Sequence, residues 1–234
     1  DGVQALTGIP IGPSWVWDQV KDGITGQYPR VWHLSAGNHT LQIGNREDGA
    51  RLDAIEIRKV GCSPELQVTP CQATPYVQRV HVGGSSPYTD VGGNVWAADK
   101  AYVSGSWGYV GSGGTARDPG TTDPIAGTED DTLYRSYRYG ESLTYKFDLP
   151  FNGDYRVTLH FVEPYWTQSG RRRFDVAING VTRTSNLDLY ATVGHDVAWA
   201  PTYDVTVANG QITILLSRRE DNAILSGIKV ESAW

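Results

Sequence analysis

Methionine is absent from the 234 residues of this sequence, and there are only two cysteines and four phenylalanines. Because even position 1 lacks methionine, we expect a processed product or a fragment of a longer chain. No apolar run approaches the roughly 18 residues of a membrane-spanning helix, and no basic-then-apolar signal peptide opens the sequence. The net charge of −6 argues against nucleic acid. The sequence therefore predicts neither a membrane nor a nucleic acid as partner.

Tryptophan, tyrosine and glycine are plentiful instead, with 8, 13 and 27 residues. Tryptophan and tyrosine combine a flat apolar face with a polar edge, so they suit surfaces that are partly hydrated. Sugars offer the complementary surface, with C–H faces that stack on rings and hydroxyls that need hydrogen bonds. The aromatic bias therefore favours carbohydrate binding, although packing in and around a β-sandwich core would account for most of these rings.

Apolar and polar residues alternate through the second half of the chain, whereas helical periodicity is almost absent. Each alternating run predicts a strand with one buried face. Three Asn-Gly pairs, at 152–153, 179–180 and 209–210, separate apolar runs and indicate hairpin turns. Many short strands joined by such turns predict an all-β fold, an antiparallel β-sandwich or jelly roll. The predicted strands cover residues 143–147, 155–161, 174–178, 203–207 and 212–216.

An internal repeat indicates two related modules. Residues 46–57 align without gaps on residues 219–230, and both copies begin Arg-Glu-Asp. We infer the ends of two similar sandwiches, the second of which is the complete domain 76–234. Residues 1–60 would supply only the closing strands of a first, incomplete module, and we expect further sequence before Asp1. The alternatives are that those strands pair with another chain or with the second domain.

The two cysteines, Cys62 and Cys71, lie in the predicted linker 61–75. With so few residues between them a disulfide is easily formed, and it would stabilise the linker by roughly 2–3 kcal/mol. Two unpaired buried thiols are the alternative. A disulfide favours a secreted, extracellular or periplasmic location.

The most promising candidate for ligand contact is the adjacent pair Tyr165 and Trp166. Strand alternation stops at Phe161, and Pro164 forces a turn. Two neighbouring rings in the loop that follows cannot both point into the core. We expect a platform for a sugar here, with a plug that covers the rim of the core as the alternative.

A second candidate, residues 105–114, is rich in glycine and carries Trp107. It resembles a phosphate-binding loop only superficially, because Pro119 and Pro124 follow where a helix would begin. Glycine beside a ring lets a ligand approach the backbone closely. A sugar-binding loop and a mobile surface loop fit this composition equally well.

Three further features have structural explanations beside functional ones. Asp221, in the repeated Arg-Glu-Asp corner, could accept sugar hydroxyls or cap a turn, and its counterpart in the first copy favours the structural role. Residues 171–173, three arginines, could meet an anionic polysaccharide, but a solvated strand edge explains them better. The acidic turn 129–131 leaves a structural calcium ion open; such sites need six or more oxygens, and no other cofactor is expected.

A series of short segments runs through residues 76–234 in a recognisable order. The segments are 82–84 with Asp90, 132–139, 153–155, 161–169, 174–180, 187–190 and 193–195. In order and spacing they resemble the malectin family of carbohydrate-binding domains, which also occurs as a module appended to bacterial polysaccharide-degrading enzymes. Residues 1–60 resemble, more weakly, the closing strands of a related β-sandwich.

The resemblance implies a galactose-binding-like sandwich that binds glucose-containing disaccharide units through four aromatic rings and an aspartate at one end. Position by position, these fall on Trp107 with Gly108, Tyr139, Tyr165, Trp166 and Asp221. Tryptophan at two of these positions would enlarge the stacking surfaces. The family is non-catalytic, and the resemblance implies no metal.

We therefore expect a non-catalytic module that docks on an oligo- or polysaccharide, within a larger secreted polysaccharide-degrading enzyme. A catalytic hydrolase or lyase is the first alternative. A hydrolase needs two carboxylates about 5–10 Å apart, and a lyase needs a base with a neutralising arginine. The attractive candidates are Glu163, Asp175, Glu220 and Asp221 for a hydrolase, and His195, Tyr139 and Arg138 for a lyase. A structural spacer that binds nothing is the second alternative.

Overall fold

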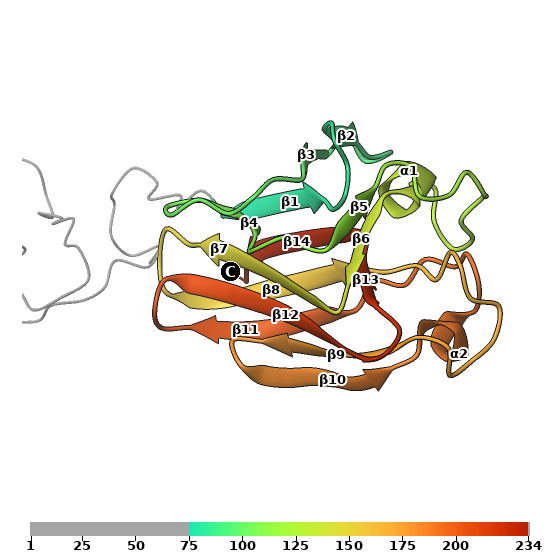
Figure 1. Ribbon diagram of the computed structural model, residues 1–234. Coiled ribbons are helices and arrows are strands. Elements are labelled where there is room, and N and C mark those ends of the chain that lie inside the picture. Colours follow the sequence, from blue (N-terminus) through green and yellow to red (C-terminus); the bar gives the residue numbers. More distant parts are fainter. Residues whose placement is uncertain (1–74, 234) are drawn as a thin grey trace, which may run out of the picture. The chain divides into compact units, whose positions relative to one another are not determined.

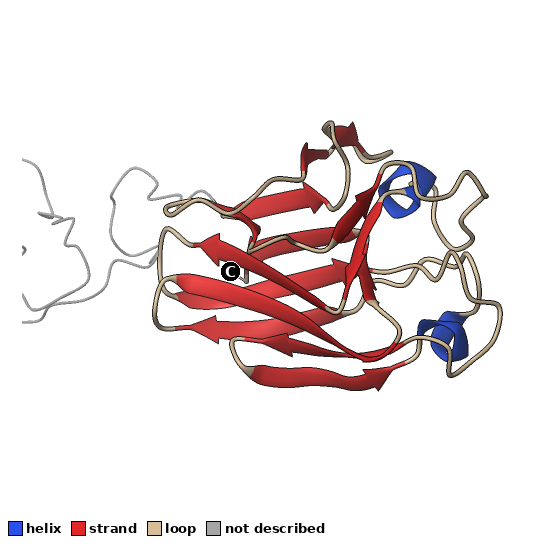
Figure 2. Ribbon diagram, viewed as in Figure 1, coloured by secondary structure: helices blue, strands red, loops and turns tan. Residues whose placement is uncertain are grey.

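Strands make up almost all of the regular structure of residues 75–233, the part of the chain that the computed structural model describes. Figure 2 shows the strands in red and two short helices in blue. The predicted all-β fold is therefore confirmed. The predictions for residues 1–60 and for Cys62 and Cys71 concern residues outside the described part.

Two large sheets and one small sheet form the domain (Figure 1). Their strand orders are β11-β8-β14-β1-β3-β2, β10-β9-β12-β7-β4 and β13-β6-β5. Neighbouring strands are antiparallel except β1 and β3. The strands are β1 (Val77–His81), β2 (Tyr88–Thr89), β3 (Val95–Ala98), β4 (Trp107–Tyr109), β5 (Thr115–Arg117), β6 (Tyr137–Gly140), β7 (Ser142–Asp148), β8 (Gly153–His160), β9 (Arg173–Ile178), β10 (Val181–Leu187), β11 (Thr202–Val207), β12 (Gln211–Glu220), β13 (Ala223–Leu225) and β14 (Gly227–Ser232). The helices are α1 (Asp131–Arg135) and α2 (Leu189–Val193).

The main core lies between the two large sheets and is filled by the apolar members of each alternating strand. In β7, for example, Leu143, Tyr145 and Phe147 are fully buried, while their neighbours are partly or fully exposed. The five predicted strands all appear, as β7, β8, β9, β11 and β12. At the turn between β9 and β10, Asn179 and Gly180 both have positive φ, the conformation of a two-residue hairpin turn with the right twist.

A second, smaller core covers the outer side of β8. Its members are Trp96, Ile125, Leu133, Tyr134 and Val162. His160, the last residue of β8, packs against two of these rings, with centroid distances of 4.9 Å to Trp96 and 5.6 Å to Tyr134. Burial, and then the charge of Lys229, lowers the pKa of His160 from 6.5 to about 4. The fold therefore favours the neutral imidazole.

The domain is expected to lose stability on acidification in a window set by this histidine. The unfolded chain binds the proton near pH 6.5 and the folded chain only near pH 4, so the contribution of His160 is complete above pH 6.5 and is lost as the pH falls toward 4. The loss amounts to about 3 kcal/mol. Urea denaturation at several pH values should show it, and His160→Gln should flatten the dependence between pH 6.5 and 4. An equally steep dependence in His160→Gln would assign the effect to other groups.

Candidate functional site

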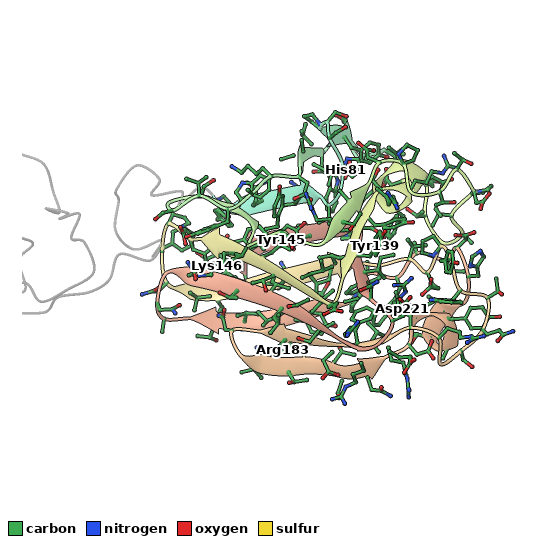
Figure 3. The ribbon with its side chains drawn as sticks, in the orientation of Figure 1. His81, Tyr139, Tyr145, Lys146, Arg183 and Asp221 are labelled. Atoms are coloured by element: carbon green, nitrogen blue, oxygen red, sulfur yellow. The ribbon has the colours of Figure 1, made fainter. Side chains whose placement is uncertain are left out.

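Several connections meet at one end of the sandwich. β8 and β12 end there, at His160 and Glu220, and β9 begins opposite Glu220. β7 also begins there, since Ser142 pairs with Ser217 of β12. The loops at this end comprise residues 140–141, 161–172 and 221–222, which we call the rim. Figure 3 labels Tyr139 and Asp221 in this region.

The loop after β8 presents two neighbouring rings at the rim. Tyr165 is 69% exposed, the largest exposed fraction among the large hydrophobic side chains of the described residues. Its ring stands at 88° to that of Trp166, with 4.8 Å between the centroids. This arrangement lets one ring present its face while the other presents an edge. The expected placement of this pair in a loop outside the core is therefore confirmed.

A buried carboxylate holds this loop in shape. Glu163 is completely buried. Its Oε1 accepts hydrogen bonds from the backbone N–H groups of Tyr165 and Trp166, at 3.1 and 3.0 Å. Its Oε2 accepts a 2.6 Å bond from Nε of Arg172, whose side chain is only 7% exposed. The buried ion pair thus fixes the backbone from which both rings project.

Asp221 joins this arrangement from the corner between β12 and β13. Its Oδ2 accepts a 2.7 Å hydrogen bond from the indole Nε1 of Trp166 and lies 3.5 Å from Nη1 of Arg172. The backbone at Asp221 has a φ of 52°, a left-handed conformation that aspartate tolerates at tight corners. Since Oδ1 contacts only the side-chain amide of Asn222, at 3.5 Å, it remains accessible to a ligand hydroxyl.

His195 supports the same loop from the segment after α2. Its Nδ1 lies 3.2 Å from the carbonyl oxygen of Trp166, and its Nε2 lies 3.1 Å from Oδ2 of Asp196. The backbone N–H of Asp196 donates to the carbonyl of Glu163. The backbone on both sides of Tyr165, at Glu163 and Trp166, is therefore tied to residues 195–196.

Tyr139 lies beside the rim on β6, where it pairs with Ile224, three residues after Asp221. Its ring is 6.3 Å from that of Tyr137, and both rings are partly exposed. Burial raises the pKa of Tyr137, and the charges of Arg117 and Arg172 oppose the rise. The family correspondence selected Tyr139 and not Tyr137, although their two-residue spacing puts both on one face of β6.

Trp107 and Gly108 lie at the opposite end of the sandwich, so their predicted place beside the other four residues is wrong. Trp107 pairs with Phe147, five residues along β7 from Ser142 at the rim. Five strand residues span about 17 Å. The indole stacks on Phe147, at 16° between planes, and Nζ of Lys100 lies 4.5 Å from its centroid. The indole therefore packs on the edge of the sheet instead of facing the rim.

Gly108 has a structural reason for being glycine. It is buried, and a Cβ added there would lie 2.5 Å from the carbonyl oxygen of Lys100. The backbone of residues 100–102 runs parallel beside β4 at this point, as the bond from Tyr109 N–H to the Lys100 carbonyl shows. Close approach of the chain to itself, not of a ligand, requires the glycine.

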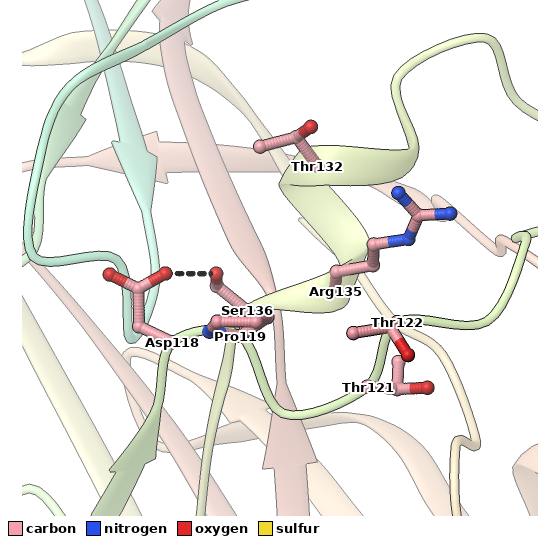
Figure 4. Close-up of a pocket in the computed structure, with 7 residues that line it drawn as sticks. All are labelled: Asp118, Pro119, Thr121, Thr122, Thr132, Arg135 and Ser136. Carbon is pink, nitrogen blue, oxygen red and sulfur yellow. Dashed lines mark hydrogen bonds between the residues drawn. The ribbon is translucent and has the colours of Figure 1, made fainter.

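A cavity of about 290 Å³ lies beside Ser136, the residue before Tyr137 (Figure 4). It is lined by Asp118, Pro119, Thr121, Thr122, Thr132, Arg135 and Ser136. Between two lining residues, Pro119 and Thr121, the carbonyl of Gly120 accepts a 3.3 Å hydrogen bond from the Tyr137 hydroxyl. The charged groups of the cavity already have partners: Asp118 accepts from Ser85 and Ser136, and Arg135 pairs with Asp131 at 3.0 Å.

The acidic turn that left a calcium ion open uses its carboxylates within the protein. Oδ1 of Asp130 accepts from the Tyr88 hydroxyl and the Val91 N–H. Oδ2 of Asp131 accepts from Arg135. Among residues 75–233 no three His, Cys, Asp or Glu side chains lie together as metal ligands.

Comparison with known families decides what kind of domain this is. The family model described as Malectin domain matches residues 76–230. The chain belongs to the malectin family. Malectin domains bind carbohydrate and are not catalytic.

The malectin match is also seen with individual proteins. Malectin-A of Xenopus laevis is 32% identical over 146 residues, which are 61% of this chain and 49% of that protein. Human malectin is 34% identical over 105 residues, covering 43% and 36%. The chain thus spans about half the length of these relatives, or less.

Solved structures with the malectin fold include parts of larger proteins. The crystal structure of a Bacteroides uniformis β-glucuronidase matches with a TM-score of 0.61 and 27% identity, over 68% of this chain and 18% of that one. The extracellular domain of ANXUR1 from Arabidopsis thaliana matches with a TM-score of 0.56 over 66% of this chain and 47% of that one. At 19% identity the second likeness shows the fold alone.

Proposed function

We propose that the rim binds an oligo- or polysaccharide by ring stacking and hydrogen bonding, without catalysing a reaction on it. The observation that carries the proposal is the exposed Tyr165 beside Trp166, whose indole is fixed by Asp221. A ring held in one orientation stacks on a pyranose without first losing rotational freedom. Oδ1 of Asp221, whose bond from the Asn222 amide is a long 3.5 Å, would accept a hydroxyl of the same sugar.

The proposed ligand-binding residues are Tyr139, Tyr165, Trp166 and Asp221, together with Tyr137, whose ring is 6.3 Å from that of Tyr139. A shallow, hydrated site of this kind would bind with roughly −4 to −7 kcal/mol, or dissociation constants from millimolar to about 10 µM. Two modules in one chain would raise the avidity for a polymer.

The acidic residues that a hydrolase would use support a binding function instead. Glu163 is completely buried and bonded to Arg172, so it cannot reach a glycosidic bond. Asp175 accepts a 2.6 Å bond from Arg219 on the surface of the sheet. The arginine that a lyase would use, Arg138, is also unavailable to a substrate, because it is buried and paired with Asp99.

We further propose that this module works outside the cytoplasm, as part of a larger polysaccharide-degrading protein. Within residues 75–233 no helix is long and apolar enough to cross a membrane. The fold itself occurs in an extracellular domain, that of ANXUR1. The β-glucuronidase match supports the second point, because this fold occupies only 18% of that enzyme and leaves room for a catalytic domain.

The proposal predicts that Trp166→Ala lowers the affinity for glycan about a hundredfold. The change removes a stacking surface and also the indole bond that orients Asp221. Tyr165→Ala, at an exposed position, should lower the affinity about tenfold. Glycan arrays would identify a ligand for the whole chain, and isothermal titration calorimetry would then compare the variants.

Trp107→Ala is the matched control, because it makes the same change at the other end of the sandwich. Its affinity should equal that of the parent chain. Thermal denaturation should show that Trp166→Ala and Tyr165→Ala remain folded. Unchanged affinity in Trp166→Ala would place the site elsewhere, and an array with no bound glycan would contradict carbohydrate binding by this chain.

A further inference from the structure

Two exposed arginines lie against the aromatic rings of the proposed site. Cζ of Arg171 is 5.3 Å from the ring centroid of Trp166. Cζ of Arg117, on β5, is 5.6 Å from that of Tyr139, and its Nη2 donates a 3.2 Å bond to the tyrosine hydroxyl. Each guanidinium therefore lies against a different ring of the proposed site, Trp166 in the loop after β8 or Tyr139 on β6.

These two arginines differ from the others near the rim, which are paired with carboxylates. Arg172 pairs with Glu163, Arg173 with Glu220 at 3.8 Å, Arg218 with Glu141 at 2.7 Å and Arg219 with Asp175 at 2.6 Å. Within residues 75–233, neither Arg117 nor Arg171 has a carboxylate oxygen within 4 Å. In a chain with more acidic than basic residues, two unpaired cations beside the rings need an explanation.

Both guanidinium groups lie over their rings, Arg171 at 5.3 Å from the centroid of Trp166 and Arg117 at 5.6 Å from that of Tyr139. Arg138, by comparison, lies closer, 3.7 Å from the centroid of Tyr109. A cation beside a stacked pyranose can reach a substituent of that pyranose, and arginine binds carboxylate or sulfate oxygens through two parallel hydrogen bonds.

We propose that the glycan bound at the rim is anionic, with its carboxylate or sulfate groups held by Arg117 and Arg171. This inference rests on the proposed carbohydrate binding at the rim and names the class of sugar. The carboxylates of the site repel an anionic glycan only weakly, because each lies beside the cation of Arg172. Glu163 is buried in its pair with Arg172, and Asp221 lies 3.5 Å from the same arginine.

The experiment compares matched sugars on the intact chain. The probes are 1,4-linked glucose oligosaccharides of both anomeric configurations, the same oligosaccharides with the C6 hydroxymethyl group oxidised to a carboxylate, and their 6-sulfate esters. We expect at least one anionic member to bind about tenfold more tightly than its neutral counterpart at low salt, because each exposed ion pair contributes a factor of about two to five. Raising the salt to about 0.5 M should shrink the difference.

Arg117→Gln and Arg171→Gln should each remove about a two- to fivefold part of the preference and leave binding of the neutral sugar within about twofold. Arg183→Gln is the matched control, because Arg183 is an exposed arginine on β10 for which no carboxylate partner lies among the described residues, and Figure 3 labels it away from Tyr139. It should leave the preference unchanged. If the C6-oxidised oligosaccharide binds more tightly than the 6-sulfate ester, the anionic group of the ligand is a carboxylate; the reverse order indicates a sulfate.

Equal affinities for neutral and anionic sugars, with Trp166→Ala abolishing both, would overturn the inference and leave carbohydrate binding at the rim intact. A preference that survives in the double variant Arg117→Gln/Arg171→Gln would also overturn it. Absence of binding to every probe and to a broad array would overturn the inference together with the proposed function.

Discussion

Replacing Arg172 by methionine is expected to lower the free energy of unfolding by about 3–5 kcal/mol, the range for a buried charge left without its partner. Methionine fills much of the space of the aliphatic stem but leaves the carboxylate of Glu163 buried with no counter-charge. Ionised, that carboxylate costs several kcal/mol to desolvate. For a domain of this size the melting temperature should fall by roughly 10 °C.

The same substitution should weaken glycan binding, because Glu163 shapes the loop that carries Tyr165 and Trp166. Glu163→Gln separates the two roles, since its amide oxygen can still accept the backbone bonds of the loop without a charge. We expect the double variant Glu163→Gln/Arg172→Met to recover part of the lost stability. Calorimetric melting and glycan titration on the same samples would measure both effects.

Arg173→Met is the control for this prediction. Arg173 pairs with Glu220 at 3.8 Å, and the side chain of Arg173 is 41% exposed and that of Glu220 57% exposed. Exposed pairs contribute at most about 1 kcal/mol, so this neighbouring substitution should change the melting temperature little. A loss in Arg172→Met no larger than that in Arg173→Met would show that the buried pair contributes little to stability.

Asp99→Ala is expected to have a comparable effect at a second buried charge. Its Oδ2 accepts a 2.9 Å bond from the Gly83 N–H and a 3.0 Å bond from the Tyr145 hydroxyl, and it also pairs with Nε of Arg138. The aspartate side chain is 3% exposed and that of Arg138 is 10% exposed. Removing the carboxylate strands a buried cation and a fully buried hydroxyl, so we expect a loss of about 3–5 kcal/mol.

Equilibrium urea denaturation would measure the loss, with two comparison variants. Tyr145→Phe removes only the hydroxyl and should cost about 1 kcal/mol. Glu141→Ala breaks the exposed pair with Arg218, whose side chains are 70% and 51% exposed, and should cost less than 1 kcal/mol. If Asp99→Ala were no worse than Glu141→Ala, the buried network would not be a stabilising feature. Glycan affinity should change less than stability, since the hydrogen bonds of this network go to Gly83, Gly113 and Tyr145 and not to Tyr165, Trp166 or Asp221.

The β-sandwich was predictable because its evidence is local. Alternation such as that of Leu143, Tyr145 and Phe147 is a property of consecutive residues, and these side chains are indeed buried. The Asn-Gly pair at 179–180 carries its turn conformation in its own backbone preferences. The placement of Tyr165 and Trp166 in a loop followed equally from Pro164 and the end of alternation.

Two aspects of the candidate site could not be read in this way. Trp107 was assigned to the wrong end because strand register, not the residue itself, determines where it lies: β4 pairs with the far half of β7. The place of Tyr137 depends equally on tertiary packing, which brings its hydroxyl to the carbonyl of Gly120. Both aspects depend on pairings between segments whose distance along the chain carries no information about register.

The sequence by itself determined the fold class, the strands and the residue types suited to a sugar, because side-chain periodicity and turn preferences act over a few residues. The tertiary structure decided which of those residues meet. Glu163 and Arg172, the indole of Trp166 and Asp221, and the unpaired Arg117 beside Tyr139 are contacts across 9, 55 and 22 positions. Burial and charge pairing select such contacts only once the sheets are packed, so they became visible only in the folded domain.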